Sequence, residues 1–223
     1  MATGKGYFVT GTDTGVGKTW VSLAIMARLQ QQGLTVVGMK PVASGCERIA
    51  GRLCNEDALL IQQQGSLTLP YDTINPYAFA PAIAPHLAAE QAGVLIEPGR
   101  LKQVYQQLAQ DAEWVVVEGA GGWLVPLGAD FSIAELARSL GLPVILVVGL
   151  RLGCISHALL SAQAIRASGC TLHGWIANTL DPTMPCLEEN IRSIAERIEA
   201  PLLGTLPYRP EATAADSAGL LTL

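Results

Sequence analysis

The chain has 223 residues, a length that suits one medium-sized α/β domain with a substantial core. Hydrophobic residues make up 50% and charged residues 15%, an apolar balance consistent with part of the surface being buried between subunits. The net charge of −5 argues against a general nucleic-acid binder, because phosphate contacts require a basic face.

The N-terminal and apolar segments predict a cytoplasmic protein that does not enter a membrane. The N-terminal stretch "MATGKGYFVTGTD" lacks a long apolar segment followed by a cleavage site. The longest apolar run, "LPVILVVGL", is far too short to span a bilayer and is typical of a buried strand. The cysteines form no C-x-x-C pair, and their odd number and scattered spacing favour reduced, buried thiols over disulfides or a zinc site. They are Cys46, Cys54, Cys154, Cys170 and Cys186.

Short apolar runs alternate with helical patterns along the chain. The runs predict strands at Tyr7–Gly11, Thr35–Lys40, Trp114–Gly119, Pro143–Gly149, His173–Asn178 and Pro201–Leu206. Helical patterns cover residues 18–32, 101–110, 132–140, 156–168 and 187–199, and several end in a glycine, as at Gly33, Gly141 and Gly169. This order predicts an α/β fold: a mostly parallel sheet with helices on both faces.

Ligands of such sheets bind beyond the carboxyl ends of the strands, so the residues at those ends are the first candidates for a site. Residues 43–99 are less regular and rich in proline, and we expect them to contribute long loops to this rim.

The stretch "TGTDTGVGKT", Thr10–Thr19, follows the first strand and opens the first helix. Such a turn offers backbone N–H groups and a helix N-terminus to phosphates, with Lys18 able to reach terminal phosphates and Thr19 a magnesium ion. The common spacing G-x-x-x-x-G-K-[ST] would place glycine at position 12, where this chain has Thr12. The alternative is an ordinary glycine-rich strand-to-helix turn.

The stretch "VVVEGAGG" ends an apolar strand with Glu118 at the same rim. Magnesium bound to phosphates takes one or two protein carboxylates, so Glu118 is a candidate ligand, and the small residues 119–122 would allow close backbone approach. The alternative is an acidic strand end with a glycine-rich turn. Asp57 opens a helix in "NEDALLIQ", where an acidic residue also favours the helix start by itself.

Two further strand ends carry polar side chains. Lys40, in "MKPVASG", places a cation where phosphates would lie, although an isolated lysine there is more often a solvated strand end. Asn178 ends "WIAN", and its amide can both donate to and accept from the edge of an adenine. The histidines show no metal-ligand or hydrolase spacing, and we expect structural roles for all three. They are His86, His157 and His173.

Taken in order, these stretches resemble the dethiobiotin synthetase family. The matching segments span almost the whole chain: "YFVTGTDTGVGKT", "KPVASG", "NEDALLIQ", "INPYAFAPAIAPH", "WVVVEGAGGWLVPL", "LPVILVVGLRLGCISHALLSAQAI", "GWIAN" and "PLLGTLPY". The longer loop spacing is this family's habit. The resemblance implies a P-loop NTPase-like fold in a single domain over residues 1–223, ATP and Mg²⁺ as cofactors, and a homodimer.

The resemblance also implies a reaction, a step of biotin biosynthesis. One amine of 7,8-diaminopelargonate (7,8-diaminononanoate) reacts with CO2 to give a carbamate. ATP phosphorylates the carbamate, and the second amine attacks the mixed anhydride to close a cyclic urea. Dethiobiotin, ADP and phosphate are the products.

The site residues follow from the same resemblance. Lys18 and Lys40 would be catalytic, neutralising charge during phosphoryl transfer. The metal would be held by Thr19, Asp57 and Glu118. The substrate would be bound by Thr14, Ser44, Gly153, Cys154, Ile155 and Ser156, the last four offering N–H groups to its carboxylate across the dimer interface. The nucleotide would contact Gly15, Val16, Gly17, Lys18, Thr19, Trp20, Asp57, Glu118, Gly119, Ala120, Gly121, Asn178, Thr179, Pro207, Tyr208 and Arg209, with adenine near Asn178 and residues 207–209.

One departure from the family pattern concerns the loop, where members often carry glutamate and this chain has Gly15. A possible carboxylate near the phosphates is thereby lost; we expect activity to be retained, while the metal affinity and the nucleotide preference are left open. The C-terminal stretch 209–223 matches only loosely.

Two other functions remain open at this point. Partition or septum-positioning ATPases share this kind of loop but carry a second lysine five residues before the loop lysine, where this chain has Asp13. The second alternative is a protein that binds a nucleotide for regulation and has lost catalysis. Gly15, which replaces the family's glutamate in the loop, is the main observation that favours it.

Overall fold

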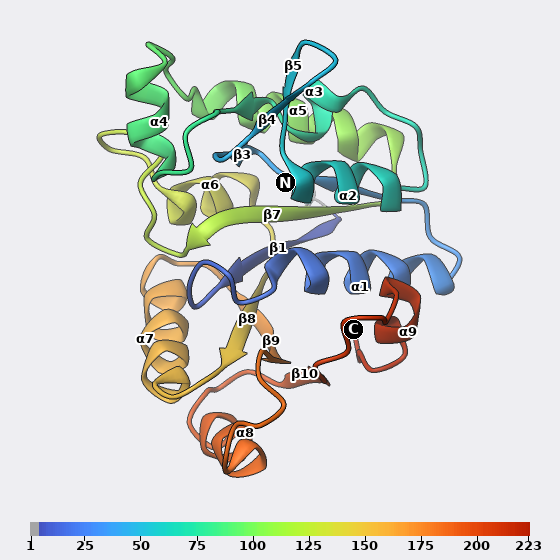
Figure 1. Ribbon diagram of the computed structural model, residues 1–223, viewed down its shortest axis with the longest axis vertical. Helices are drawn as coiled ribbons and strands as arrows, with labels where there is room; N and C mark the ends of the chain where they lie inside the picture. Colours follow the sequence, from blue (N-terminus) through green and yellow to red (C-terminus); the bar gives the residue numbers. More distant parts are fainter. Residues whose placement is uncertain (1–4) are drawn as a thin grey trace.

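A computed structural model describes residues 5–223 and shows one central six-stranded sheet with the order β10-β9-β8-β1-β7-β2 (Figure 1). Every pairing within this sheet is parallel, which confirms the predicted α/β class. The strands are β1 (Gly6–Gly11), β2 (Val36–Met39), β7 (Trp114–Gly122), β8 (Val144–Leu150), β9 (Leu172–Thr179) and β10 (Leu202–Leu206).

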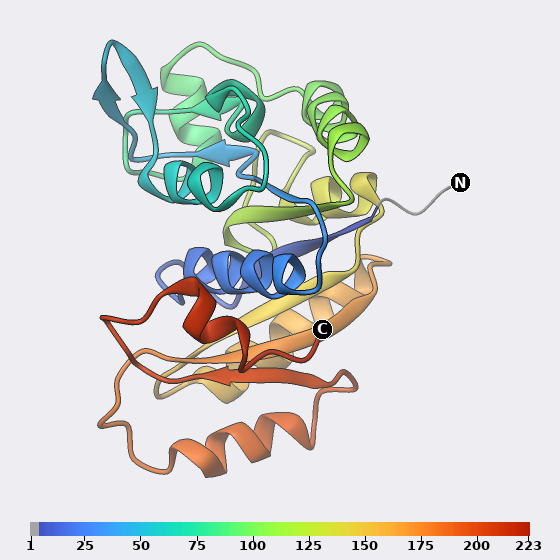
Figure 2. The same cartoon turned by 90° about the vertical axis from the view of Figure 1, so that its right-hand side faces the viewer.

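Helices cover both faces of the sheet because its strands are apolar on both sides. In β1, Phe8 packs into the core of one face and Val9 into the core of the other. The first core contains residues of α5 (Pro98–Asp111), α6 (Ile133–Leu140), α7 (Cys154–Ala167) and α8 (Leu187–Ala195). The second contains α1 (Lys18–Gln31), beside which the short α9 (Ala214–Ala218) lies (Figure 2).

The proline-rich region contains more regular structure than the loops expected for it. Its elements are β3 (Val42–Ala43), β4 (Glu47–Ile49), β5 (Arg52–Cys54), α2 (Glu56–Gln64), α3 (Tyr71–Ile74), β6 (Tyr77–Ala78) and α4 (Pro85–Gln91). Two asparagines organise it: the Asn55 side chain accepts the Ala58 N–H at 3.2 Å and caps α2, while the Asn75 amide donates to the Lys40 carbonyl at 2.7 Å. The elements of this region are short and depend on such side-chain contacts, so they lack the long apolar periodicity by which a helix or strand is predicted from sequence.

The predicted glycine ends of helices are confirmed, because Gly33, Gly141 and Gly169 have φ angles of 84°, 67° and 75°. Among residues 5–223, no helix has the length and apolar character needed to cross a membrane. All five cysteines are free, but burial holds only for Cys46, Cys54 and Cys154. Cys170 is half-buried, and Cys186 is exposed because it lies in the turn before α8.

The direction of strand addition reverses at β1, which lies between β8 and β7 in the sheet. The connection after β1 leads to β2 on one side, and β8 joins on the other. Such a switch point leaves a crevice at the carboxyl ends of the central strands. The loop at residues 12–17 begins at this point and is therefore at the usual ligand position of the fold.

Candidate active site

The loop at residues 12–17 forms a cradle of backbone amides at the start of α1. Gly17 is the N-cap of α1 with φ 86°, and a Cβ added there would approach the Asn178 amide nitrogen to 2.1 Å. Only glycine fits this position, because both the left-handed conformation and the contact exclude a side chain. No side chain caps α1 and no acidic residue lies in its first turn, so its first N–H groups are available to an anion.

Lys18 lies at the base of this cradle and is only 7% exposed. Its ammonium group donates to the backbone carbonyl of Asp13 at 2.8 Å. Burial, followed by repulsion from Lys40, lowers the pKa of Lys18 to about 8. A phosphate bound in the cradle would favour the charged form and reverse this shift.

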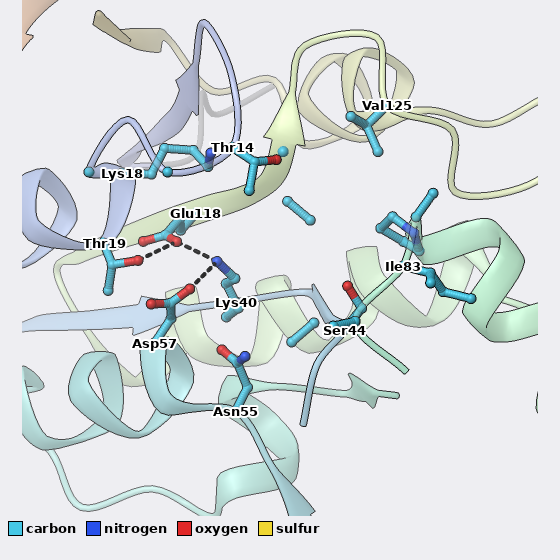
Figure 3. Close-up of a pocket in the computed structure, with 18 residues that line it drawn as sticks. Thr14, Lys18, Thr19, Lys40, Ser44, Asn55, Asp57, Ile83, Glu118 and Val125 are labelled. Carbon is cyan, nitrogen blue, oxygen red and sulfur yellow. Dashed lines mark hydrogen bonds and ion pairs between the residues drawn. The ribbon is translucent and has the colours of Figure 1, made fainter. Parts of the chain in front are cut away.

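Lys40, directly after β2, binds two carboxylates at the edge of the cradle (Figure 3). Its ammonium group donates to Asp57 at 3.1 Å and also to Oε1 of Glu118, which in turn accepts the hydroxyl of Thr19 at 3.0 Å. Four residues from α1, β2, α2 and β7 therefore converge on one point, although they are far apart in sequence.

The charges of this cluster stabilise one another. Burial acts to lower the pKa of Lys40, but Glu118 and Asp57 outweigh it and raise that pKa above its usual value. Burial acts to raise the pKa of Asp57, but Lys40 outweighs it and holds that pKa below its usual value. Lys40 therefore stays protonated in conditions where Lys18 loses its proton.

The cluster opens into a cavity of about 770 Å³. On the side away from Lys18, the cavity wall is largely apolar and includes residues 82–85 and Val125, with Ser44 on the same side (Figure 3). The complete lining is Thr14, Gly15, Gly17, Lys18, Thr19, Lys40, Ala43, Ser44, Asn55, Asp57, Ala82, Ile83, Ala84, Pro85, Glu118, Ala120, Gly121 and Val125. No role was predicted for the apolar wall; the signal that could have revealed it is the run "APAIAP", residues 80–85, which has no polar side chain.

The donors present fit a magnesium ion bound together with phosphates. Oε2 of Glu118 is buried without a hydrogen-bond partner, which leaves one carboxylate oxygen available beside the Thr19 hydroxyl. Within residues 5–223 no group of three or more histidine, cysteine or acidic side chains could hold a metal by itself. Magnesium does not require one, since it takes one or two carboxylates and completes its shell with phosphates and water.

A second, smaller cavity of about 240 Å³ lies beyond the ends of β9 and β10. Its lining contains Trp20, Asn178, Thr179, Leu180, Pro207, Tyr208, Arg209 and Pro210, which includes the residues expected near adenine. The Asn178 amide donates one N–H to the Val16 carbonyl at 2.9 Å, so its oxygen and second N–H remain available.

Some expected site residues do not line either of these two cavities. Val16 is 1% exposed, and a Cβ at Gly119 would lie 3.2 Å from Phe8, so the Val16 side chain and the Cα of Gly119 pack in the core, and their contact with the nucleotide stays a prediction. Glu118 is within β7 rather than at its end, because the strand continues to Gly122 through an irregularity opposite β1. Gly153–Ser156 form the start of α7, with Gly153 and Ser156 exposed, and they lie outside the large cavity.

Comparison with known proteins identifies the relatives of this chain. A family model described as an AAA domain matches residues 5–216. The ATP-dependent dethiobiotin synthetase BioD of Pseudomonas aeruginosa is 52% identical over 97% of this chain and 96% of its own length. The proteins of the same name from Aromatoleum aromaticum and Xanthomonas oryzae pv. oryzae are 48% and 51% identical, over 100% and 97% of this chain and 99% and 97% of their own lengths.

Among solved structures, the cell division protein MinD of Aquifex aeolicus aligns with a TM-score of 0.58 at 15% identity, covering 96% of this chain and 87% of its own. The cell division protein FtsY of Thermotoga maritima aligns with a TM-score of 0.51 at 17% identity, covering 98% and 69%. At such low identity these structures establish only the fold, which is that of P-loop NTPases. From its identity to the curated relatives along nearly its whole length, the chain belongs to the family of ATP-dependent dethiobiotin synthetases.

Proposed function

We propose that this protein uses ATP and magnesium to convert 7,8-diaminopelargonate and CO2 to dethiobiotin, ADP and phosphate. The family membership supports the overall reaction, and the convergence of Lys18, Lys40 and two carboxylates on one cavity is the observation that carries the proposal.

Three bond-forming steps make up the proposed reaction. One amine nitrogen of the substrate adds to CO2 and loses a proton, which gives a carbamate. A carbamate oxygen then attacks the γ-phosphorus and ADP leaves, which gives a carbamic-phosphoric anhydride. Finally the second amine adds to the carbamate carbon, loses a proton and expels phosphate, which closes the urea ring.

The second step brings an anionic carbamate to an anionic phosphate, so it requires positive charge at the point of transfer. Lys18, in the cradle, would bind the terminal phosphates of ATP in place of the Asp13 carbonyl that it contacts in this structure. Lys40 would bind the carbamate and the transferred phosphoryl group. Against the effect of burial, Glu118 and Asp57 raise the pKa of Lys40 in the free protein, so it is charged before the substrate binds, which suits an electrostatic role rather than proton transfer.

Magnesium would be held by Thr19, Asp57 and Glu118, and when bound it neutralises charge on the phosphates. Lys40 contacts both of those carboxylates in this structure, so we expect its ammonium group to move toward the carbamate when the metal and ATP bind. Binding of the metal and ATP would therefore free the Lys40 ammonium group from the two carboxylates and make it available to the substrate.

The apolar wall of the large cavity would hold the hydrocarbon chain of the substrate. Ile83 and Val125 lie across the cavity from Lys18 (Figure 3). The Ser44 hydroxyl, on the same side as Ile83, would hydrogen-bond a substrate amine. We propose that the substrate's distant carboxylate binds the N–H groups of Gly153–Ser156 in a second subunit, because within one chain these residues lie outside the cavity.

The test is phosphate release by the purified protein with Mg-ATP and bicarbonate, with and without 7,8-diaminopelargonate, combined with detection of dethiobiotin by mass spectrometry. We expect phosphate release that depends on the diamine and matches dethiobiotin in amount. Tight ATP binding without any product would instead favour the regulator alternative, and the first variant to test would then be Gly15→Glu. Gly15 has φ 73° and no atom within 4 Å of an added Cβ, so a side chain there has room but a strained backbone.

A further inference from the structure

An ion pair joins the phosphate-binding loop to the connection between β8 and α7. Asp13, in the loop, pairs through Oδ2 with the guanidinium group of Arg151, the first residue after β8. Arg151 lies two residues before Gly153, the N-cap of α7. From the sequence, Asp13 was noted only as the position where partition ATPases carry a second lysine, and no role was predicted for Arg151.

Asp13 is a central contact of the loop because three of its oxygens accept hydrogen bonds. Its backbone carbonyl accepts the Lys18 ammonium at 2.8 Å, and Oδ1 accepts the backbone N–H of Thr14 at 2.7 Å. Oδ2 binds Arg151. The orientation of Asp13 therefore affects both the lysine and the amides that face the cavity.

The pair contributes little to the stability of the fold. The side chains of Arg151 and Asp13 are 46% and 48% exposed, so solvent screens the attraction between them. We expect the pair to matter more for the affinity of a bound anion, because the Asp13 carboxylate belongs to the loop that forms the phosphate cradle. Without Arg151, that negative charge would remain in the phosphate-binding loop without its paired cation, and the exposed segment 13–15 would lose its contact with the residue that follows β8.

We propose that Arg151 is a positioning residue for ATP that acts through Asp13, neutralising its carboxylate and holding the loop against the β8–α7 connection. The inference rests on the proposed function only in that the loop binds the phosphates of ATP. Because Arg151 lies two residues before Gly153, the N-cap of α7, the same pair connects the phosphate loop to the segment proposed to bind the substrate carboxylate.

A double-mutant cycle on nucleotide affinity tests this role. The dissociation constant of a non-hydrolysable ATP analogue is measured by calorimetry, with excess magnesium, for the wild type, Arg151→Ala, Asp13→Asn and the double variant. We expect Arg151→Ala to weaken binding about tenfold in the wild-type background and less than twofold in the Asp13→Asn background. Asparagine keeps the acceptor for the Thr14 N–H but removes the charge that Arg151 neutralises.

Two further variants separate positioning from a general structural effect. Arg151→Lys keeps the charge and should restore most of the affinity, and in turnover assays Arg151→Ala should raise KM for ATP more than it lowers kcat. The matched control is Arg166→Ala at the other end of α7, whose pair with Glu199 is similarly exposed at 42% and 87% and lies outside both cavities. Its nucleotide affinity should equal that of the wild type.

The possible outcomes are distinct. Equal weakening by Arg151→Ala in both backgrounds would mean that the arginine contacts the nucleotide directly, which overturns positioning through Asp13. An Arg151→Ala variant that binds as tightly as the wild type also overturns it. A wild-type protein that does not bind the analogue would overturn the proposed function and this inference together.

Discussion

At the scale of single residues, the two lysines of the site have different electrostatic environments and should therefore have separable roles. Lys18 is buried beside another cation, so its charge is destabilised until an anion arrives. Lys40 is buried between Asp57 and Glu118, so its charge is stabilised before any ligand binds. The first arrangement suits recognition of phosphate, and the second suits a cation that remains charged during group transfer.

Replacement of Lys40 should abolish turnover and leave nucleotide binding intact. In Lys40→Ala the ATP analogue should bind within about threefold of the wild type, because the cradle and Lys18 remain, whereas dethiobiotin formation should fall by about 10³-fold or more. Calorimetry measures the affinity for the ATP analogue, and mass spectrometry measures the dethiobiotin formed. Lys18→Ala is the matched comparison, and there binding itself should weaken. Near-normal turnover in Lys40→Ala would remove this residue from the mechanism.

The lowered pKa of Lys18 predicts that nucleotide affinity depends on pH. Below about pH 8 the lysine is charged in both free and bound protein, so affinity should not change as pH falls toward 7. Above pH 8 the free protein loses the proton that the bound state needs, so each binding event takes up a proton. Affinity should then fall by up to about tenfold per pH unit.

Calorimetry of the ATP analogue at pH 7, 8 and 9, in buffers of different ionisation enthalpy, measures both the affinity and the proton uptake. Lys18→Arg serves as the control, because guanidinium stays protonated throughout this range. A wild-type affinity that is constant from pH 7 to 9 would show that Lys18 keeps its proton in the free protein.

At the scale of elements, helix α6 illustrates how local sequence supports the sheet. Ser132 caps it: the hydroxyl accepts the Ala134 N–H at 3.1 Å, and the Glu135 carboxylate accepts the Ser132 N–H at 2.9 Å. Ser132→Ala should therefore lower the free energy of unfolding by about 1 kcal/mol, measured by urea denaturation. Ser139→Ala, at an exposed position within the same helix, should change it by less than about 0.5 kcal/mol.

The strands and long helices could be predicted from sequence because their signals are local. All six predicted runs became strands of the central sheet, and the glycine ends of the helices have the expected left-handed backbone. The region around α2 and α3 was assigned too little structure, because its order depends on the side chains of Asn55 and Asn75 and on contacts between distant segments. The hydrophobic periodicity of a sequence indicates local structure but does not indicate such contacts.

The candidate site was predictable only in part, for the same physical reason. The strand-end rule placed Lys40 and Glu118 at one rim, and the structure brings them together. The pair between Asp13 and Arg151 was not predictable, since they are 138 positions apart in sequence and nothing in either segment indicates that the two side chains meet. The apolar wall at residues 82–85 also escaped notice, because composition shows that a segment is apolar but not what it faces.

At the scale of the whole molecule, the proposed carboxylate site predicts that two chains are needed to complete the substrate site. The cavity holds the lysines and an apolar wall, but it offers no N–H groups from Gly153–Ser156 to a carboxylate at the far end of the substrate. Near that segment, Leu152 is 97% exposed and Leu160, on α7, is 61% exposed. Leu124, after β7, is 66% exposed. Apolar side chains of this size gain free energy by burial in an interface.

A charge placed among these leucines should therefore separate the subunits and weaken substrate binding. At micromolar concentration we expect the wild type to sediment as a dimer and Leu152→Glu as a monomer, because the interface would bury an unpaired carboxylate. The ATP analogue should bind with unchanged affinity, since Lys18 and its loop belong to the same chain, while KM for the diamine should rise by at least about tenfold. Leu95→Glu is the control, because this leucine is 74% exposed but lies between α4 and α5, outside the proposed contact. If Leu152→Glu sediments as a monomer and keeps the wild-type KM for the diamine, the carboxylate site belongs to a single chain, and the subunit contact has no part in substrate binding.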